Sequence, residues 1–316
     1  MPLPIAALAA DGGETEQSDR RAGEDRWVPS LTITSGVTIQ HQDGSASSDL
    51  YEDITSVPAP DPVFLRGFVK GDDLAVSPFV GGALELMAPA LSLPGRPRPF
   101  LSGEILPTFA AERELALEGD PSCVRGPETG APCVRDEVGT RTNPFEADSA
   151  LGQGSKTTAE VETVAFGASL GVAFPARLGK RQLLIKPSVA WINYGLEAEG
   201  LVVDAICNPP NRCLVLGNSL RETTLTASGS QRFNGIGPGL DIEVNTGRYG
   251  PLGVSLFMGA RAYAIVGDRS FSFETEETFD DPIGMDRAVG RFEVEVAPWM
   301  FRGHVGIRFS LLGNEE

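Results

Sequence analysis

Eight segments of the chain, between Ser30 and Leu311, alternate apolar residues with polar or small ones at a period of two. The contrast is clearest in residues 159–174, where Val164, Phe166 and Leu170 alternate with small residues. A period of two places successive side chains on opposite faces of a β-strand. A sheet that closes on itself in lipid turns its apolar face outward and pairs every backbone group. The pattern therefore predicts an all-β fold, an eight-stranded antiparallel up-and-down transmembrane β-barrel with long extracellular loops.

The last segment changes its parity. Phe292 and Val294 are apolar at even positions, as are Val296 and Met300, whereas Phe301 and Val305 are apolar at odd positions. If one face is apolar throughout, one extra residue must be absorbed between Pro298 and Phe301. A β-bulge at Pro298 is predicted, because proline donates no hydrogen bond to the ladder.

The connections between the segments are alternately long and short. The long ones are 43–73, 113–158, 200–227 and 267–287, and the short ones are 89–99, 175–182 and 246–251. Outer-membrane barrels have short periplasmic turns and long extracellular loops. We therefore expect a location in the bacterial outer membrane, with the long loops extracellular and both termini periplasmic.

The remaining segments fit this organisation. Residues 1–10 resemble a truncated signal peptide, and 11–29 are expected to form a flexible acidic leader. The barrel is expected over 30–312, with a short tail at 313–316. No run of eighteen apolar residues occurs, which excludes a helical membrane span.

Four cysteines occur as two local pairs inside long connections, Cys123 with Cys133 and Cys207 with Cys213. Four cysteines allow three connectivities, of which pairing within each loop is the simplest. Disulfides in polar loops indicate an oxidising compartment such as the periplasm or the cell surface. The spacing is not that of a zinc site.

The formal net charge is −17, which argues against nucleic acid as a partner because nucleic-acid binding needs a basic surface. The charge is compatible with cationic ligands, or with lipopolysaccharide bridged by divalent ions. No calcium-loop spacing is present, so neither a specific metal site nor a cofactor is predicted.

Parity directs nine ionisable residues into the barrel interior. An eight-stranded barrel is just wide enough for its side chains to fill, and opposite charges buried together compensate one another. We expect a plug of salt bridges, with selective permeation of a small solute as the alternative. No catalytic motif accompanies these residues, so an enzyme is not expected. The nine are Glu85, Glu104, Lys186, Asp241, Glu243, Arg261, Arg302, His304 and Arg308.

From Ser30 to Leu311 the chain resembles the small outer-membrane β-barrel proteins of Gram-negative bacteria, the class of OmpA-like, OmpX-like and OmpW-like barrels. The resemblance rests on the architecture and on the final strand Val305-Gly306-Ile307-Arg308-Phe309. Members of this class end in an aromatic residue that is recognised during assembly. Here residues 310–316 follow Phe309, which displaces that signal.

Three functions are compatible with these features. The first is a structural or surface-interaction role through disulfide-braced extracellular loops, in a monomer surrounded by outer-membrane lipid and lipopolysaccharide and able to meet a cell-surface ligand. The second is a porin-like channel for small solutes. The third is a soluble lipocalin-like barrel, in which the apolar face would surround a ligand.

Overall fold

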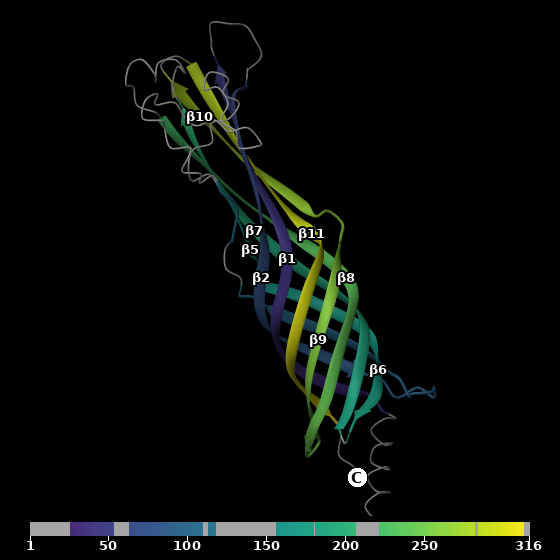
Figure 1. Ribbon diagram of the computed structural model, residues 1–316. Coiled ribbons are helices and arrows are strands. Elements are labelled where there is room, and N and C mark those ends of the chain that lie inside the picture. The colour runs from purple at the N-terminus through teal and green to yellow at the C-terminus, as the bar shows by residue number, and fades with distance from the viewer. Residues whose placement is uncertain are drawn as a thin grey trace, which may run out of the picture.

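The computed structural model describes residues 26–53, 63–109, 113–117, 156–179, 181–206, 221–281 and 284–312 (Figure 1). These residues form one antiparallel sheet of eleven strands. Among them is no helix long and apolar enough to cross a membrane. The strands are β1 Val28–Asp53, β2 Val63–Met87, β3 Arg98–Pro107, β4 Arg113–Leu117, β5 Lys156–Val161, β6 Val164–Leu178, β7 Arg181–Ile206, β8 Arg221–Tyr249, β9 Leu252–Val266, β10 Ser270–Asp281 and β11 Gly284–Leu311.

Eight of these strands close into a ring in the order β1-β2-β3-β6-β7-β8-β9-β11, and β11 returns to pair with β1. The closing pair runs in register from Ser30 opposite Ser310 to Gln40 opposite Met300. Each ring strand is followed around the ring by the next one along the chain, which is up-and-down topology. The predicted eight-stranded barrel is confirmed.

The two ends of the described chain lie at the edge that carries the short turns. Val28 pairs with Met87 beside the β2–β3 turn, and the backbone N–H of Leu312 donates to the carbonyl of Pro251 in the β8–β9 turn. Gly250 in that turn has a φ of 60°, a backbone conformation that favours glycine. We call this edge the short-turn end.

A band of apolar side chains, here called the belt, surrounds the ring strands. Leu84, Leu170 and Met258 point outward and are 69%, 63% and 58% exposed. Exposed apolar surface of this extent fits a lipid environment, in which such side chains replace hydrocarbon contacts. The aromatic residues Trp191 and Trp299 lie near the upper margin of the belt, away from the short-turn end.

The strands continue past this margin into a narrower β-structure, here called the extension (Figure 1). It comprises residues 43–53, 63–72, 195–206, 221–233 and 284–297 together with β4, β5 and β10. The polarity of the two faces is reversed here. Phe292, Val294 and Val296 point inward and are buried, whereas Glu293 and Glu295 point outward.

The prediction that the β-bulge at Pro298 contains one extra residue is wrong. Met300 and Val296 are buried on the same face as Arg302, so the strand keeps one parity from Phe292 to Arg308. Gln40 pairs with Met300 and Gln42 with Val296, so three residues of β11 oppose His41 alone. The β-bulge at Pro298 therefore inserts two extra residues into β11, rather than one. Because two is an even number, the side chains on either side of the bulge keep the same parity. The sequence pattern changes because the medium outside the barrel changes from lipid to water.

Much of the sequence expected to form long loops is strand. β1 and β2 pair as far as Tyr51 opposite Val63, and β10 pairs with β11 as far as Asp281 opposite Gly284. Where burial is described, in residues 271–274 and 292–296, these strands also alternate, but with the apolar face inward. Outward apolar residues therefore mark each strand only as far as the margin of the belt.

Candidate functional site

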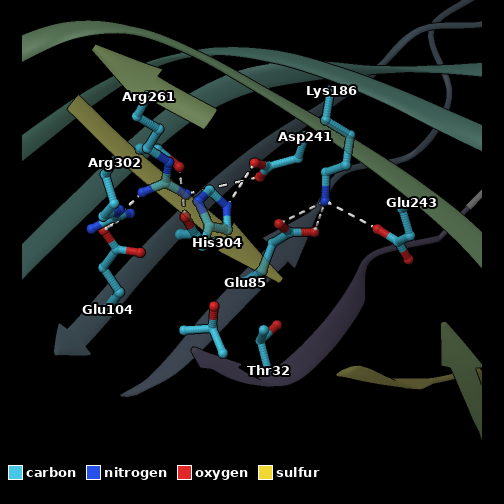
Figure 2. A network of polar contacts seen from close by, with 12 residues as sticks. Thr32, Glu85, Glu104, Lys186, Asp241, Glu243, Arg261, Arg302 and His304 are labelled. Atoms are coloured by element: carbon cyan, nitrogen blue, oxygen red, sulfur yellow. Dashed lines mark hydrogen bonds and ion pairs between the residues drawn. The ribbon is translucent and has the colours of Figure 1, made fainter. Parts of the chain in front are cut away.

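All nine ionisable residues predicted for the interior lie in the barrel lumen and are less than 8% exposed. They come from six ring strands, β2, β3, β7, β8, β9 and β11, and the side chains labelled in Figure 2 point toward one another. Ion pairs and hydrogen bonds connect them into two adjoining groups. We call the whole set the ion network.

The group nearer the short-turn end is centred on Lys186. Its ammonium nitrogen lies 2.5 Å and 2.7 Å from the two carboxylate oxygens of Glu85, and 3.6 Å from Glu243 Oε2. Arg308 contacts both carboxylates, with Nη2 3.2 Å from Glu85 Oε2 and Nη1 donating to Glu243. Arg308 Nε also donates to Thr32 Oγ1 at 3.2 Å. Two cations thus share two carboxylates.

The second group is centred on Glu104. One of its oxygens, Oε1, accepts from Arg261 Nη1 at 2.7 Å and from Arg302 Nη2 at 2.6 Å. Asp241 lies 2.9 Å from His304 Nε2 and 3.8 Å from Arg261 Nη2. Arg261 therefore connects Glu104 with Asp241 and, through Asp241, with His304.

The formal charges of the ion network cancel when His304 is neutral. Glu85, Glu104, Asp241 and Glu243 supply four negative charges, and Lys186, Arg261, Arg302 and Arg308 supply four positive ones. Removing charges from water is costly unless opposite charges and hydrogen bonds compensate them. Exact pairing of this kind explains how so many ionised groups can be buried in one lumen.

Aromatic rings border the cations of the ion network. Lys186 Nζ lies 4.5 Å from the centre of the Phe100 ring, and Arg308 lies 5.1 Å from that of Phe257. Arg302 lies 5.5 Å from the Phe79 ring centre and 5.6 Å from that of Tyr263. A ring face attracts a cation and at the same time excludes water. Parity would have placed these four rings in the lumen, but Phe79, Phe100 and Phe257 were not singled out from the sequence.

Glycines make room for the ion network on the interior face. A Cβ at Gly259 would collide with Asp241 Oδ1 and would lie 2.7 Å from His304 Nε2. A Cβ at Gly167 would collide with the Glu104 carboxylate. The small interior residues of these strands therefore allow large charged side chains to cross the lumen from other strands.

Apolar clusters close the lumen on both sides of the ion network. At the short-turn end Val28, Met87, Phe100 and Ala173 are buried together. On the other side a larger apolar core runs from Phe79 and Leu106 into the extension. A final cluster around Phe292 and Leu225 continues it towards the tip. Buried side chains of the described residues therefore occupy the lumen on both sides of the ion network.

A further group lies on the outer surface just above the belt. His41, Asp43 and Asp72 bring one potential metal-ligand atom each within 4.8 Å of one another, and His41 Nε2 lies 3.4 Å from Asp72 Oδ2. Asp43 and Asp72 are direct cross-strand partners, which explains their proximity. The side chains of His41 and Asp72 are 46% and 61% exposed, so water solvates both. The predicted disulfide residues Cys123, Cys133, Cys207 and Cys213 lie outside the described residues.

No protein-family model matches the chain, and no curated protein matches it in sequence. Among solved structures, it is similar to the outer membrane protease OmpT from Escherichia coli at 10% identity and a TM-score of 0.28, covering 88% of this chain and 96% of that one. It is also similar to Ail, the attachment invasion locus protein of Yersinia pestis, at 11% identity and a TM-score of 0.23, covering 87% and 97%.

These likenesses are remote, and the assignment of the fold rests on this chain's own features. The ring of eight antiparallel strands is closed, its exterior is apolar and its interior is polar. This combination is that of a small barrel of the outer-membrane type.

Proposed function

We propose that the protein is a non-enzymatic β-barrel of the bacterial outer membrane, whose sealed barrel anchors a rigid extension at the cell surface for a structural or surface-interaction role. The observation that carries the proposal is the contrast between the two parts of the molecule. The lumen is filled by compensated charges and apolar clusters, whereas the extension continues the barrel beyond the belt with a polar exterior.

The orientation follows from the connections. Short turns face the periplasm in outer-membrane barrels, so both termini would lie there and the extension would project from the cell. The outer face of the extension carries Glu197, Glu199, Glu293 and Glu295. An acidic surface of this kind favours cationic partners, or lipopolysaccharide phosphates bridged by divalent ions. We further propose that the two cysteine pairs form disulfides within the connections 118–155 and 207–220, and that the barrel is monomeric.

The sealed lumen supports the surface role over a solute channel. A channel needs a continuous water-filled path, whereas Lys186, Arg302 and Met300 are 0%, 2% and 1% exposed. Ion-conductance recordings in planar bilayers separate the two functions. The refolded protein is expected to give no stable conductance, and a reproducible, solute-selective current would establish a channel instead.

Protease shaving of intact cells tests the location and the orientation together. Cleavage is expected only in the connections at the tip of the extension, and the belt fragments should remain with the outer-membrane fraction after detergent extraction. Extraction into buffer without detergent would favour the soluble lipocalin-like alternative. Cleavage at the β8–β9 turn in intact cells would reverse the proposed orientation.

A further inference from the structure

The connection between β2 and β3 differs from the other two short turns. β6 and β7 pair as far as Leu178 opposite Arg181, and β8 and β9 pair as far as Tyr249 opposite Leu252, so both of those turns are tight. The β2–β3 connection instead runs from Ala88 to Pro97. It projects sideways from the barrel wall near the short-turn end, where it is drawn in blue (Figure 1). We call this connection the arm.

The tip of the arm is a defined turn. The backbone N–H of Arg96 donates to the carbonyl of Leu93 at 2.9 Å, and Pro94 and Gly95 lie between these two residues. Gly95 has a φ of 80°, so the tip has the features of a type II turn, in which a proline precedes a glycine. Proline also restricts the unfolded chain, which lowers the entropy lost when the turn forms.

The base of the arm is fixed to the barrel. The backbone N–H of Ala88 donates to the carbonyl of Pro99 at 2.8 Å, and that of Leu91 donates to the carbonyl of Pro97 at 2.9 Å. Arg98 Nε donates to the carbonyl of Ala88 at 2.9 Å. The arm is therefore an ordered projection, and its side chains keep the places that its backbone gives them.

Two leucines of this ordered arm are exposed. Leu91 and Leu93 are 43% and 56% exposed. The nearest outward pair of the belt is Leu86 opposite Leu101, which are 42% and 57% exposed. Apolar surface thus continues from the belt onto the arm. Because lipid surrounds the belt of an outer-membrane barrel, the same lipid borders the arm.

The surroundings of the arm are basic and aromatic. Arg96 is exposed at the tip, and Arg177 is exposed on β6, which pairs with β3 at the base of the arm. Tyr249 and Trp27, at the same end of the barrel, are 72% and 59% exposed, and exposed aromatic residues of barrels gather at the membrane interfaces. The short turns contain arginine and lysine but no aspartate or glutamate, in residues 89–99, 175–182 and 246–251. A layer of anionic lipid headgroups complements this charge.

We propose that the arm lies in the headgroup layer of the leaflet next to the short-turn end and binds anionic phospholipid there. Leu91 and Leu93 contact the acyl chains close to the headgroups, while Arg96 and Arg177 contact the phosphates. The arm thereby holds the barrel at a fixed depth in the bilayer. This role is separate from the proposed surface role, because the arm and the extension lie at opposite ends of the barrel.

The position of the arm is tested by Leu93→Trp in protein labelled with fluorotryptophan and refolded in lipid nanodiscs. The new fluorine resonance is expected to broaden with lipid that carries a nitroxide near the headgroup end of its acyl chain, and to resist a gadolinium chelate dissolved in the water. Leu84→Trp, on the belt, is the control for lipid contact. Glu293→Trp, on the exposed outer face of the extension, is the control for water and should show the opposite response. Leu91→Trp supplies the same test if the first variant does not fold.

The preference for anionic lipid is tested by comparing nitroxide-labelled phosphatidylglycerol with equally labelled phosphatidylcholine, each at the same low fraction in phosphatidylcholine nanodiscs. Broadening at position 93 is expected to be about threefold or more stronger with phosphatidylglycerol, because basic side chains concentrate anionic lipid around them. The double substitution Arg96→Gln with Arg177→Gln should remove this difference. Arg269→Gln, beyond the opposite margin of the belt, is the matched control and should retain it.

Two results would overturn the proposal. Broadening at position 93 by the gadolinium chelate, without broadening by the labelled lipid, would place the arm in water, where a soluble protein could bind it instead. Equal broadening by the two labelled lipids would show that the arm does not recognise anionic headgroups.

Discussion

Arg261 and Glu104 project from opposite walls of the barrel, and their guanidinium and carboxylate groups meet at 2.7 Å in the lumen. Their strands, β9 and β3, are four places apart around the ring of eight in either direction. No backbone hydrogen bond can join walls that far apart. The ion pair therefore cross-links the barrel through its axis, and Arg302 shares the same carboxylate oxygen from β11.

Neutralising this shared carboxylate should weaken the barrel strongly. Glu104→Gln leaves Arg261 and Arg302 buried without their common counterion, and loss of one partner of a buried ion pair typically costs about 3–5 kcal/mol. The free energy of unfolding in urea, measured in lipid vesicles, is expected to fall by that amount. Glu293→Gln, on the exposed outer face of the extension, is the control and should change it by less than about 0.5 kcal/mol. Equal effects of the two substitutions would mean that the lumenal pairing contributes nothing to stability.

A methyl group at Gly259 should disturb the second group of the ion network. The added Cβ of Gly259→Ala would meet Asp241 and His304, and overpacking of this kind costs about 1–3 kcal/mol. Gly303 is the matched control, because it lies next to His304, faces outward and has nothing within 4 Å of an added Cβ. Thermal unfolding followed by heat-modifiable migration on gels should show a lower midpoint for Gly259→Ala only. A similar loss for Gly303→Ala would point to a general requirement for glycine in these strands.

The position at which the outer face changes from apolar to polar should mark the boundary of the membrane. Val305 lies in the middle of the belt on β11, and Glu293 points outward from the same strand in the extension. Val305→Arg should cost about 2–4 kcal/mol for folding into lipid vesicles, the usual penalty for arginine at the bilayer midplane. Glu293→Arg should fold as the unmodified protein does, because water already surrounds that position. A large penalty at residue 293 would place the extension in lipid.

The extension should unfold independently of the belt. Phe292 is 1% exposed, and its ring stacks on Phe273 with the centres 5.3 Å apart. Phe292→Ala creates a cavity expected to cost about 3–5 kcal/mol. Amide hydrogen exchange should accelerate in β10 and in residues 284–297, while protection in residues 299–311 is retained. Uniform acceleration along β11 would show that the two parts unfold as one unit.

Much of the barrel was predictable because its strands obey one simple rule. Parity assigned Leu84 and Val305 to the exterior and Lys186 and Arg261 to the interior, and the structure places them so. The rule fails only where its premise, lipid outside the barrel wall, no longer holds. Phe292, Val294 and Val296 follow the same period but face inward, because the extension is surrounded by water and buries its apolar face as a soluble protein does.

The sequence alone does not predict which interior charges pair with one another. Lys186 lies 2.5 Å from Glu85 and 3.6 Å from Glu243, whereas Asp241, its direct cross-strand partner, forms a hydrogen bond with His304. Which side chains meet depends on the stagger of the strands, the barrel radius and the glycines that leave space beside them.

The sequence by itself determined the number of strands in the ring, the face on which each side chain of the belt lies and the end at which the short turns gather. These properties are local, since they follow from a period of two and from the lengths of the connections. The tertiary structure alone decided how far the strands extend, where their polarity reverses and which charges pair across the lumen. These properties depend on the medium outside the wall and on distances between residues more than a hundred positions apart, such as Arg261 and Glu104.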